Sequence, residues 1–307
     1  MRIGLIDVDG HNFPNIPLMK LSAWHKAQGD HVEWYSPLLS GKMDIVYCAK
    51  VFSFTEDYAF PINAEKIIKG GTGYRISLRD GKEVWTGKDT SLPEEIEHTY
   101  PDYGLYGISD RAYGFLSRGC PRQCQFCHVK SKEGIRAYKV ADLSEFWNGQ
   151  KEIEICDPNI LACPDWRDLL TQLVHSKAKV NFNQGLDARL LTEEKINLLK
   201  QIKIAHFHFA WDNPADGDKI VPKLTMFTDM VRPSKHSTVC YCLVNFSSTI
   251  DQDLERIYTL RELDIQPYVM IYDKEHCDPI YRRMQRWVNA PRLFWSTPKF
   301  EEYVKAR

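Results

Sequence analysis

Three closely spaced cysteines have the residue type and spacing most suited to chemistry in this chain. Cys120, Cys124 and Cys127 are separated by three and then two residues, which places three thiols on one short loop. Thiolates bind the irons of a 4Fe-4S cluster, so three of them can hold three of its four irons. Because no fourth cysteine follows at a regular spacing, the pattern predicts a cluster with one iron open to another ligand.

Two other uses of these thiols are less consistent with the spacing. Zinc usually takes four Cys or His ligands in paired short spacings, and His128 could be the fourth ligand here. A Cys-x3-Cys spacing is unusual for zinc, however, and no second pair follows. A disulfide would leave one thiol unpaired. Zinc binding by a non-catalytic protein is therefore kept as the alternative to the iron-sulfur cluster.

The cysteine loop resembles the signature of the radical S-adenosylmethionine (SAM) superfamily. That signature is Cys-x3-Cys-x2-Cys with an aromatic residue before the last cysteine, here Phe126. The resemblance implies that the amino and carboxylate groups of SAM chelate the open iron. It also implies that an electron from the reduced cluster cleaves SAM to a 5′-deoxyadenosyl radical, which abstracts hydrogen from a substrate. A reducing partner such as flavodoxin or ferredoxin would supply the electron, and the substrate is unknown.

Composition and charge exclude few partners. The 307 residues, 43% of them hydrophobic, can bury one large core or two modest ones. With 40 basic and 41 acidic residues, the net charge of −1 creates no field that attracts nucleic acid or a membrane. No apolar run is long enough to span a bilayer, and the N-terminus turns acidic at Asp7, too early for a signal peptide. We therefore expect a cytoplasmic protein whose nine cysteines are ligands or buried hydrophobes.

Residues 1–105 are predicted to form a small Rossmann-like α/β domain. Helical periodicity over Ile16–Ala27 follows the candidate N-cap Asn15. The dipeptide Asp80-Gly81 predicts a hairpin turn, and the polar stretch 91–102 predicts a linker. Strands are expected at residues 2–8, 31–35 and 45–52.

Residues 106–290 are predicted to form a partial (β/α)6 barrel, followed by a C-terminal tail at 291–307. Strand and helix patterns alternate six times there, and right-handed crossovers place every helix outside a parallel sheet. The cysteine loop then follows the first strand, at the C-terminal strand ends where such barrels carry their active sites. The strands are expected at 112–117, 152–156, 179–183, 204–211, 238–244 and 267–272, and the helices at 143–147, 166–176, 193–201, 218–231, 250–263 and 279–288.

Polar residues at two strand exits are candidate contacts of the SAM methionine part. Asp157 and Asn159 stand where many family members carry a Gly-Gly-Glu run that holds the SAM amino group, with helix capping as the alternative. Arg189 could meet the SAM carboxylate in a bidentate contact oriented by Asp187. A local salt bridge between these two residues is the alternative.

Four further residues at strand exits complete the predicted SAM site. Gln184 belongs to the polar exit of the third strand, and Asp212 could bind a ribose hydroxyl or the substrate, or else cap a helix. Asn245 ends the fifth strand. Met270 on the sixth strand could flank the adenine, as the resemblance implies, although an ordinary buried strand would have the same sequence.

Two residues of the cysteine loop have simpler predicted roles. Gly119 is expected where the backbone approaches the cluster closely. Arg122 is expected only to face solvent. Outside the loop, Cys240 and Cys242 are expected to pack in the core rather than bind metal.

The segment Asp9-Gly10-His11 resembles the Asp-x-His-x-x-Gly motif of cobalamin-binding domains, in which the histidine replaces the lower ligand of cobalt. Ser53 and Gly70-Gly71 loosely match later positions of that family. The match is imperfect, because Pro14 replaces the motif's glycine and the domain is short. The resemblance implies a shortened, cofactor-free relative that covers the substrate. A cobalamin-dependent radical SAM methyltransferase is the alternative.

Overall fold

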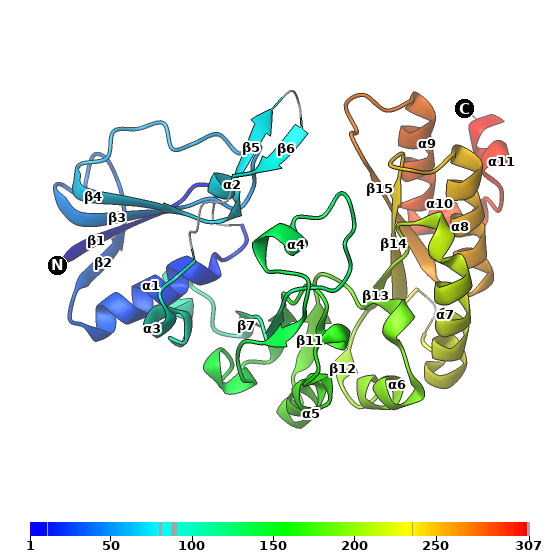
Figure 1. Cartoon of the computed structure of the whole chain (residues 1–307), viewed down its shortest axis with the longest axis horizontal. Helices are drawn as coiled ribbons and strands as arrows, with labels where there is room; N and C mark the ends of the chain where they lie inside the picture. The colour runs from blue at the N-terminus through cyan, green and yellow to red at the C-terminus, as the bar shows by residue number, and fades with distance from the viewer. Residues whose placement is uncertain (11, 80–81, 87–90, 235, 306–307) are drawn as a thin grey trace.

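The structure is a computed structural model, and it describes residues 1–10, 12–79, 82–86, 91–234 and 236–305. Within these residues the chain is a mixed α/β protein with three parallel sheets and two short antiparallel strand pairs. Figure 1 shows the N-terminal sheet at one end of the molecule and the C-terminal helices at the other.

Four parallel strands form the N-terminal sheet: β1 (Arg2–Asp7), β2 (His31–Trp34), β3 (Met43–Ala49) and β4 (Ala64–Gly70). They lie in the order β2-β1-β3-β4. Helix α1 (Ile16–Ala27) begins where Asn15 Oδ1 accepts a hydrogen bond from the Leu18 N–H at 3.2 Å. These elements confirm the predicted helix and three strands. The pattern did not indicate β4, because this edge strand is largely exposed and rich in Lys and Glu.

After β4 the chain forms an antiparallel strand pair and then a short packed helix in the segment predicted as a linker. Strands β5 (Ile76–Arg79) and β6 (Lys82–Trp85) pair antiparallel after helix α2 (Thr72–Arg75), while Asp80-Gly81 lies outside the described residues. The predicted linker contains a short helix, α3 (Glu94–Glu97), whose Ile96 is buried in the same hydrophobic cluster as residues of β1 and α1. This segment is therefore packed against the N-terminal sheet.

Seven further strands run parallel: β7 (Arg111–Gly114), β10 (Glu152–Ile155), β11 (Lys179–Phe182), β12 (Lys203–Ile204), β13 (Phe207–Ala210), β14 (Thr238–Val244) and β15 (Gln266–Ile271). They form two sheets, β12-β11-β10-β7 and β13-β14-β15, and a parallel bridge between Leu186 and Phe209 links them. The strand predicted at 204–211 is divided into β12 and β13, and the one at 112–117 ends early. The six predicted strand positions and their parallel direction are confirmed, whereas the partial barrel stays a prediction.

Helices alternate with these strands largely as predicted: α5 (Trp166–Ser176), α6 (Glu193–Leu199), α7 (Gly217–Val231), α8 (Ile250–Glu262) and α9 (Pro279–Val288). The helix predicted at 143–147 is only a 3-10 turn, Leu143–Glu145. The C-terminal tail forms α10 (Pro291–Ser296) and α11 (Phe300–Lys305), which bury Phe294 and Phe300 with residues of α9. No helix of the described ranges is long and apolar enough to cross a membrane.

A buried arginine connects the ends of β13 and β14. Arg256 of α8 is 1% exposed and donates hydrogen bonds to the carbonyl oxygens of Asp212 at 2.9 Å and Leu243 at 2.8 Å. It also pairs with the carboxylate of Asp253, which is 0% exposed. A buried guanidinium is tolerated only when paired and hydrogen-bonded, so this side chain holds two strand exits together.

Replacing this arginine should cost much more stability than replacing an exposed one. Arg256→Met leaves Asp253 as an unpaired buried charge, so we expect the free energy of unfolding to fall by about 3–5 kcal/mol. The control is Arg167→Ala, because Arg167 pairs with Glu194 at an exposed site, where the loss should stay within about 1 kcal/mol. Urea unfolding measures both. Equal losses in the two variants would contradict the role assigned to Arg256.

Candidate functional site

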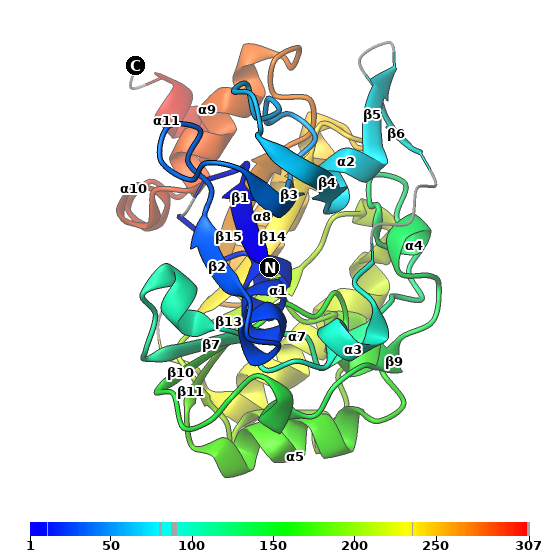
Figure 2. The same cartoon turned by 90° about the vertical axis from the view of Figure 1, so that its left-hand side faces the viewer.

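The cysteine loop leaves the sheet after β7 and is closed at its base by a short strand pair. β8 (Ser117–Arg118) pairs antiparallel with β9 (Tyr138–Lys139). Between them lies helix α4 (Val129–Lys132). Figures 1 and 2 place α4 on one side of the β7–β12 sheet and α5 on the other. The loop is therefore a separate segment that follows the C-terminal end of β7.

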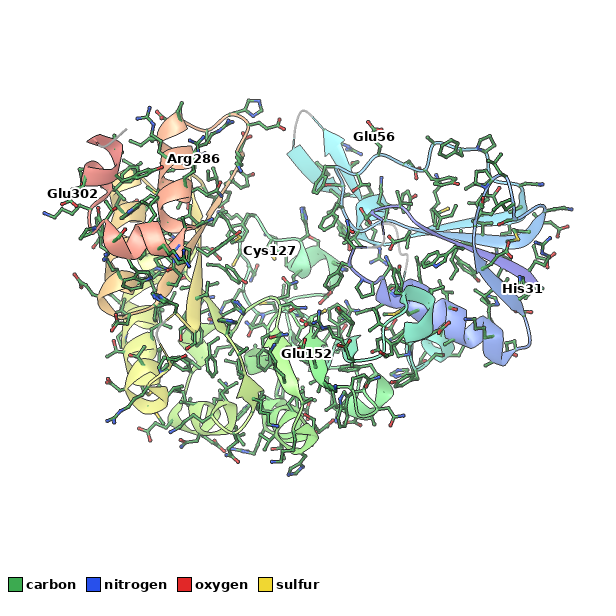
Figure 3. The ribbon with its side chains drawn as sticks, turned by 180° about the vertical axis from the view of Figure 1, so that it is seen from behind. His31, Glu56, Cys127, Glu152, Arg286 and Glu302 are labelled. Carbon is green, nitrogen blue, oxygen red and sulfur yellow. The ribbon has the colours of Figure 1, made fainter. Side chains whose placement is uncertain are left out.

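Backbone contacts give the loop a defined shape. The Cys120 N–H donates to the Gly134 carbonyl at 3.3 Å, and the Cys127 N–H donates to the Cys124 carbonyl at 3.2 Å. All three cysteines are free thiols of intermediate exposure. Figure 3 shows Cys127 in the middle of the molecule, between the N-terminal part that carries Glu56 and the C-terminal part that carries Arg286.

Gly119 is required at the loop entrance by a close backbone approach. Its φ is +78°, and a Cβ built on it would lie 2.0 Å from the Arg136 carbonyl oxygen. This approach is to the returning segment of the same loop, and the predicted approach to a cluster stays a prediction. The Glu133 carboxylate supports this closure, because it accepts hydrogen bonds from the Gly119 N–H at 3.1 Å and from Arg118 Nη1 at 2.8 Å.

Asp157 fixes the turn between β7 and β8. Its side chain is buried and accepts hydrogen bonds from the Leu116 N–H at 2.8 Å, the Ser117 N–H at 2.7 Å and the Ser117 hydroxyl at 2.6 Å. Burial raises the pKa of this carboxyl to about 7, against these hydrogen bonds, which favour the charged form. The alternative of a helix cap by Asp157 is not observed among the described residues, because Asn159 precedes the next helical turn. The contact of Asp157 with SAM stays a prediction.

Asn159 is the predicted residue that contacts a loop thiol. Its Nδ2 lies 3.4 Å from Cys120 Sγ and 3.2 Å from Asp187 Oδ2. Its Oδ1 is buried without a hydrogen-bond partner in the described part of the chain. Asn159 precedes the 3-10 turn Ile160–Ala162 but makes no side-chain cap. The alternative of helix capping is therefore wrong for this residue.

Asp187 joins the cysteine loop to two strand exits. Besides Asn159, it accepts hydrogen bonds from Arg122 Nε at 2.8 Å and from Arg189 Nε at 2.7 Å. Burial raises the pKa of Asp187, but the hydrogen bonds from Arg189 and Arg122 outweigh it and hold the pKa below its usual value. The expectation that Arg122 only faces solvent is wrong, because its side chain binds Asp187. The two residues are 65 positions apart, so the local sequence could not indicate this contact.

Arg189 is engaged by protein carboxylates on all sides of its guanidinium. It makes a bidentate contact with Asp187, and its Nη1 donates to Asp216 Oδ2 at 2.7 Å. Two arginines, Arg122 and Arg189, are thus balanced by two carboxylates. The geometry corresponds to the alternative predicted from the sequence, a local salt bridge between Arg189 and Asp187. Asp216 adds a second ion pair to it.

The remaining predicted residues lie at or near the strand exits in different settings. Asp212 Oδ1 accepts a hydrogen bond from the Leu243 N–H at 3.0 Å, and burial raises the pKa of its carboxyl. The helix cap proposed for it is instead Asn213, which caps the turn Pro214–Asp216. Asn245 has a φ of +63° and donates to the Tyr272 carbonyl at 3.0 Å. Gln184 is exposed in the turn after β11.

An aromatic chain connects the loop to the last two strands. Phe126 packs edge-to-face against Phe246 at 5.4 Å, and Phe246 packs against Tyr272 at 4.7 Å between ring centroids. Phe246 had no distinguishing signal in the sequence. On β15, Met270 is 38% exposed and Tyr268 is also exposed. The alternative for Met270, a position in an ordinary buried strand, is therefore wrong.

The loop thiols influence one another electrostatically. Burial raises the pKa of Cys124 and of Cys127, and neighbouring cysteines and Asp212 raise it further, while Arg189 lowers that of Cys124. Bare thiolates are therefore disfavoured until a cation compensates them. In the described ranges, no three His, Cys, Asp or Glu side chains are grouped so as to hold a single metal ion.

The cobalamin-like motif of the N-terminal sheet has its groups occupied by the protein itself. Asp9 accepts hydrogen bonds from the Phe52 N–H at 3.3 Å and the Thr55 hydroxyl at 2.7 Å. A Cβ on Gly71 would lie 2.3 Å from the Lys50 carbonyl oxygen, so this glycine admits protein backbone. In the structure these groups contact the protein itself, and the predicted ligand His11 lies outside the described residues.

Comparison with known proteins adds no family to this geometry. No protein-family model matches the chain, and no curated protein is significantly similar to it in sequence. The functional argument therefore depends on the residues and their arrangement.

Two glycines of the loop allow its closure to be tested. Gly119→Ala introduces a methyl group against the Arg136 carbonyl oxygen, whereas Gly134, with a φ of +92°, has nothing within 4 Å of an added Cβ. Gly134→Ala should cost only the left-handed backbone, about 1–2 kcal/mol. Gly119→Ala should lower the free energy of unfolding by clearly more, because its methyl group would lie against a backbone oxygen. Equal losses of stability in the two variants, measured by urea unfolding, would contradict this account.

The buried acid should make stability depend on pH. In the folded chain the pKa of Asp157 is about 7, above its usual value. Between these two pKa values the folded chain therefore holds a proton on Asp157 that the unfolded chain has released. The stability that this proton provides is lost as the pH rises towards 8. Relative to Asp157→Asn, which cannot titrate, wild type should lose about 3 kcal/mol between pH 5 and pH 8. Urea unfolding at the two pH values measures this difference. The control is Asp142→Asn, because the pKa of Asp142 is lowered by Lys139; its difference from wild type should stay constant, and a constant difference for Asp157→Asn would refute the prediction.

Proposed function

We propose that this chain is a radical SAM enzyme that binds a 4Fe-4S cluster through Cys120, Cys124 and Cys127. The observation that carries the proposal is the anchored loop, in which three free thiols are held over the ends of parallel strands. The proposal includes a six-strand partial barrel, a cytoplasmic location and an electron donor such as flavodoxin or ferredoxin. The substrate stays unassigned.

The residues around the loop fit a bound SAM molecule. Asn159 Oδ1 is a buried acceptor without a donor in the described part of the chain, and such an atom costs about 1–3 kcal/mol unless a ligand or water satisfies it. The ammonium group of SAM is a suitable donor. Asp212 has a second carboxylate oxygen without a hydrogen-bond partner among the described residues, which suits a ribose hydroxyl. In the proposal, Asp157 fixes the base of the loop and Arg189 holds Asp187 in place.

The protein's own contribution to the chemistry is to hold, orient and shield. When bound, the reduced cluster and SAM supply a 5′-deoxyadenosyl radical. Asp157 and Glu133 fix the base of the loop, and Asp187 fixes its middle through Arg122. The contact between Phe126 and Phe246 closes the loop towards β14. A radical needs such a fixed setting, because it would otherwise abstract hydrogen from nearby C–H and S–H groups of the protein instead of the substrate.

The cobalamin-dependent methyltransferase has less support than the cofactor-free N-terminal domain. In the N-terminal domain, Gly71 and Gly73 lie against Lys50. Asp9 there accepts a hydrogen bond from the Phe52 N–H. The non-catalytic zinc protein stays an alternative that the experiment separates. Both are distinguished from the proposed function by what the purified chain binds and releases.

Anaerobic reconstitution with iron and sulfide tests the proposal. We expect a brown protein with about four irons per chain, and dithionite with SAM should release 5′-deoxyadenosine. Alanine at Cys120, Cys124 or Cys127 should abolish both. The matched control is Cys240→Ala, since Cys240 is fully buried in β14 away from the loop, and it should retain the cluster.

Other outcomes would identify the alternatives. Tight binding of one zinc ion with no iron chromophore would refute the cluster and support the zinc protein. Retention of added cobalamin, lost in His11→Ala, together with transfer of a labelled methyl group from SAM, would support the methyltransferase. Formation of the cluster without any 5′-deoxyadenosine would leave iron binding but refute the enzymatic proposal.

A further inference from the structure

One loop thiol differs from the other two in its hydrogen bonding. Cys120 Sγ accepts a hydrogen bond from Asn159 Nδ2 at 3.4 Å, and this is the one side-chain hydrogen bond to a loop thiol within the described part of the chain. Asn159 is 3% exposed. The donor of this part-buried contact is therefore buried, while Cys120 keeps intermediate exposure. A hydrogen bond to a charged sulfur is stronger where its donor is shielded from water.

The orientation of the Asn159 amide is locked. The same Nδ2 atom also donates to Asp187 Oδ2 at 3.2 Å. A flipped amide would direct its oxygen at both the thiol and the carboxylate, which are acceptors when charged. Asp187 is itself held by Arg122, which lies between Cys120 and Cys124 in the loop. The loop and its hydrogen-bond donor are thus connected through Asp187.

The charged groups around this contact are paired with one another. The guanidinium groups of Arg122 and Arg189 face the carboxylates of Asp187 and Asp216. Among the described residues, the N–H of Asn159 is the side-chain donor that contacts Cys120 Sγ directly.

We infer that Asn159 is a positioning residue that raises the reduction potential of the cluster by hydrogen bonding to the Cys120 thiolate. The inference rests on the proposed function. Reduction adds one electron to the cluster, and part of the added charge resides on the ligating sulfurs. A hydrogen bond to sulfur stabilises the reduced state more than the oxidised state, so it shifts the potential upward.

Redox titration without SAM tests this inference. Reconstituted wild type, Asn159→Leu and Asn159→Ala are titrated, with the reduced cluster followed by electron paramagnetic resonance. Both variants should have a midpoint potential more negative than wild type. Leucine retains the side-chain volume and alanine removes it, so a shift common to both belongs to the lost N–H.

The chain offers a matched control of the same chemistry. Asn183 Nδ2 lies 3.8 Å from Sγ of Cys156, a cysteine outside the loop, and Asn183→Leu should leave the midpoint unchanged. Wild-type potentials in both Asn159 variants, or an equal shift in Asn183→Leu, would overturn the inference while the cluster stands. Loss of the cluster in both Asn159 variants would overturn it in favour of a purely structural role. Failure of wild type to form a cluster would overturn the proposed function itself.

Discussion

The buried carboxylate of Asp157 is the constraint on which the cysteine loop depends. Three hydrogen bonds from Leu116 and Ser117 converge on it at the point where the chain leaves β7. Without these acceptors, two backbone N–H groups would be buried and unsatisfied at that turn. The chain is therefore directed into β8, whose pairing with β9 closes the loop. The point from which the loop with its three thiols departs follows from this anchor.

A second constraint connects the strand exits to one another. Asp187 binds groups from the loop, from the exit of β10 and from its own exit, and Arg256 does the same for β13 and β14. Both side chains are charged and largely buried, so each is stable only with its full set of partners. This cross-linking makes the C-terminal edge of the sheets rigid. A reactive site needs a rigid edge, because small changes in the distance between reacting groups slow a reaction strongly.

Much of the fold could be predicted because its signals are local. Helix α1 has an N-cap at Asn15, helical spacing of its apolar residues and Gly29 just after its end, all within one segment. The buried strands of the sheets are short apolar runs. Where the signal was weak, the prediction failed for a physical reason. Strand β4 is exposed, and the helix expected at 143–147 is one turn that packs Phe146 against Gly114. The strand at 112–117 is cut short because Asp157 captures its last backbone groups.

The candidate site could be predicted only as far as its chemistry lies in one segment. By itself the sequence determined the three thiols, their shared loop and its place after the first strand, because spacing along the chain fixes these. Tertiary structure alone decided which side chains meet that loop. Asn159 reaches Cys120 across 39 residues and Arg122 reaches Asp187 across 65. Such contacts depend on the register of parallel strands, and no local pattern encodes which polar residue at a strand exit faces the loop, another exit or solvent.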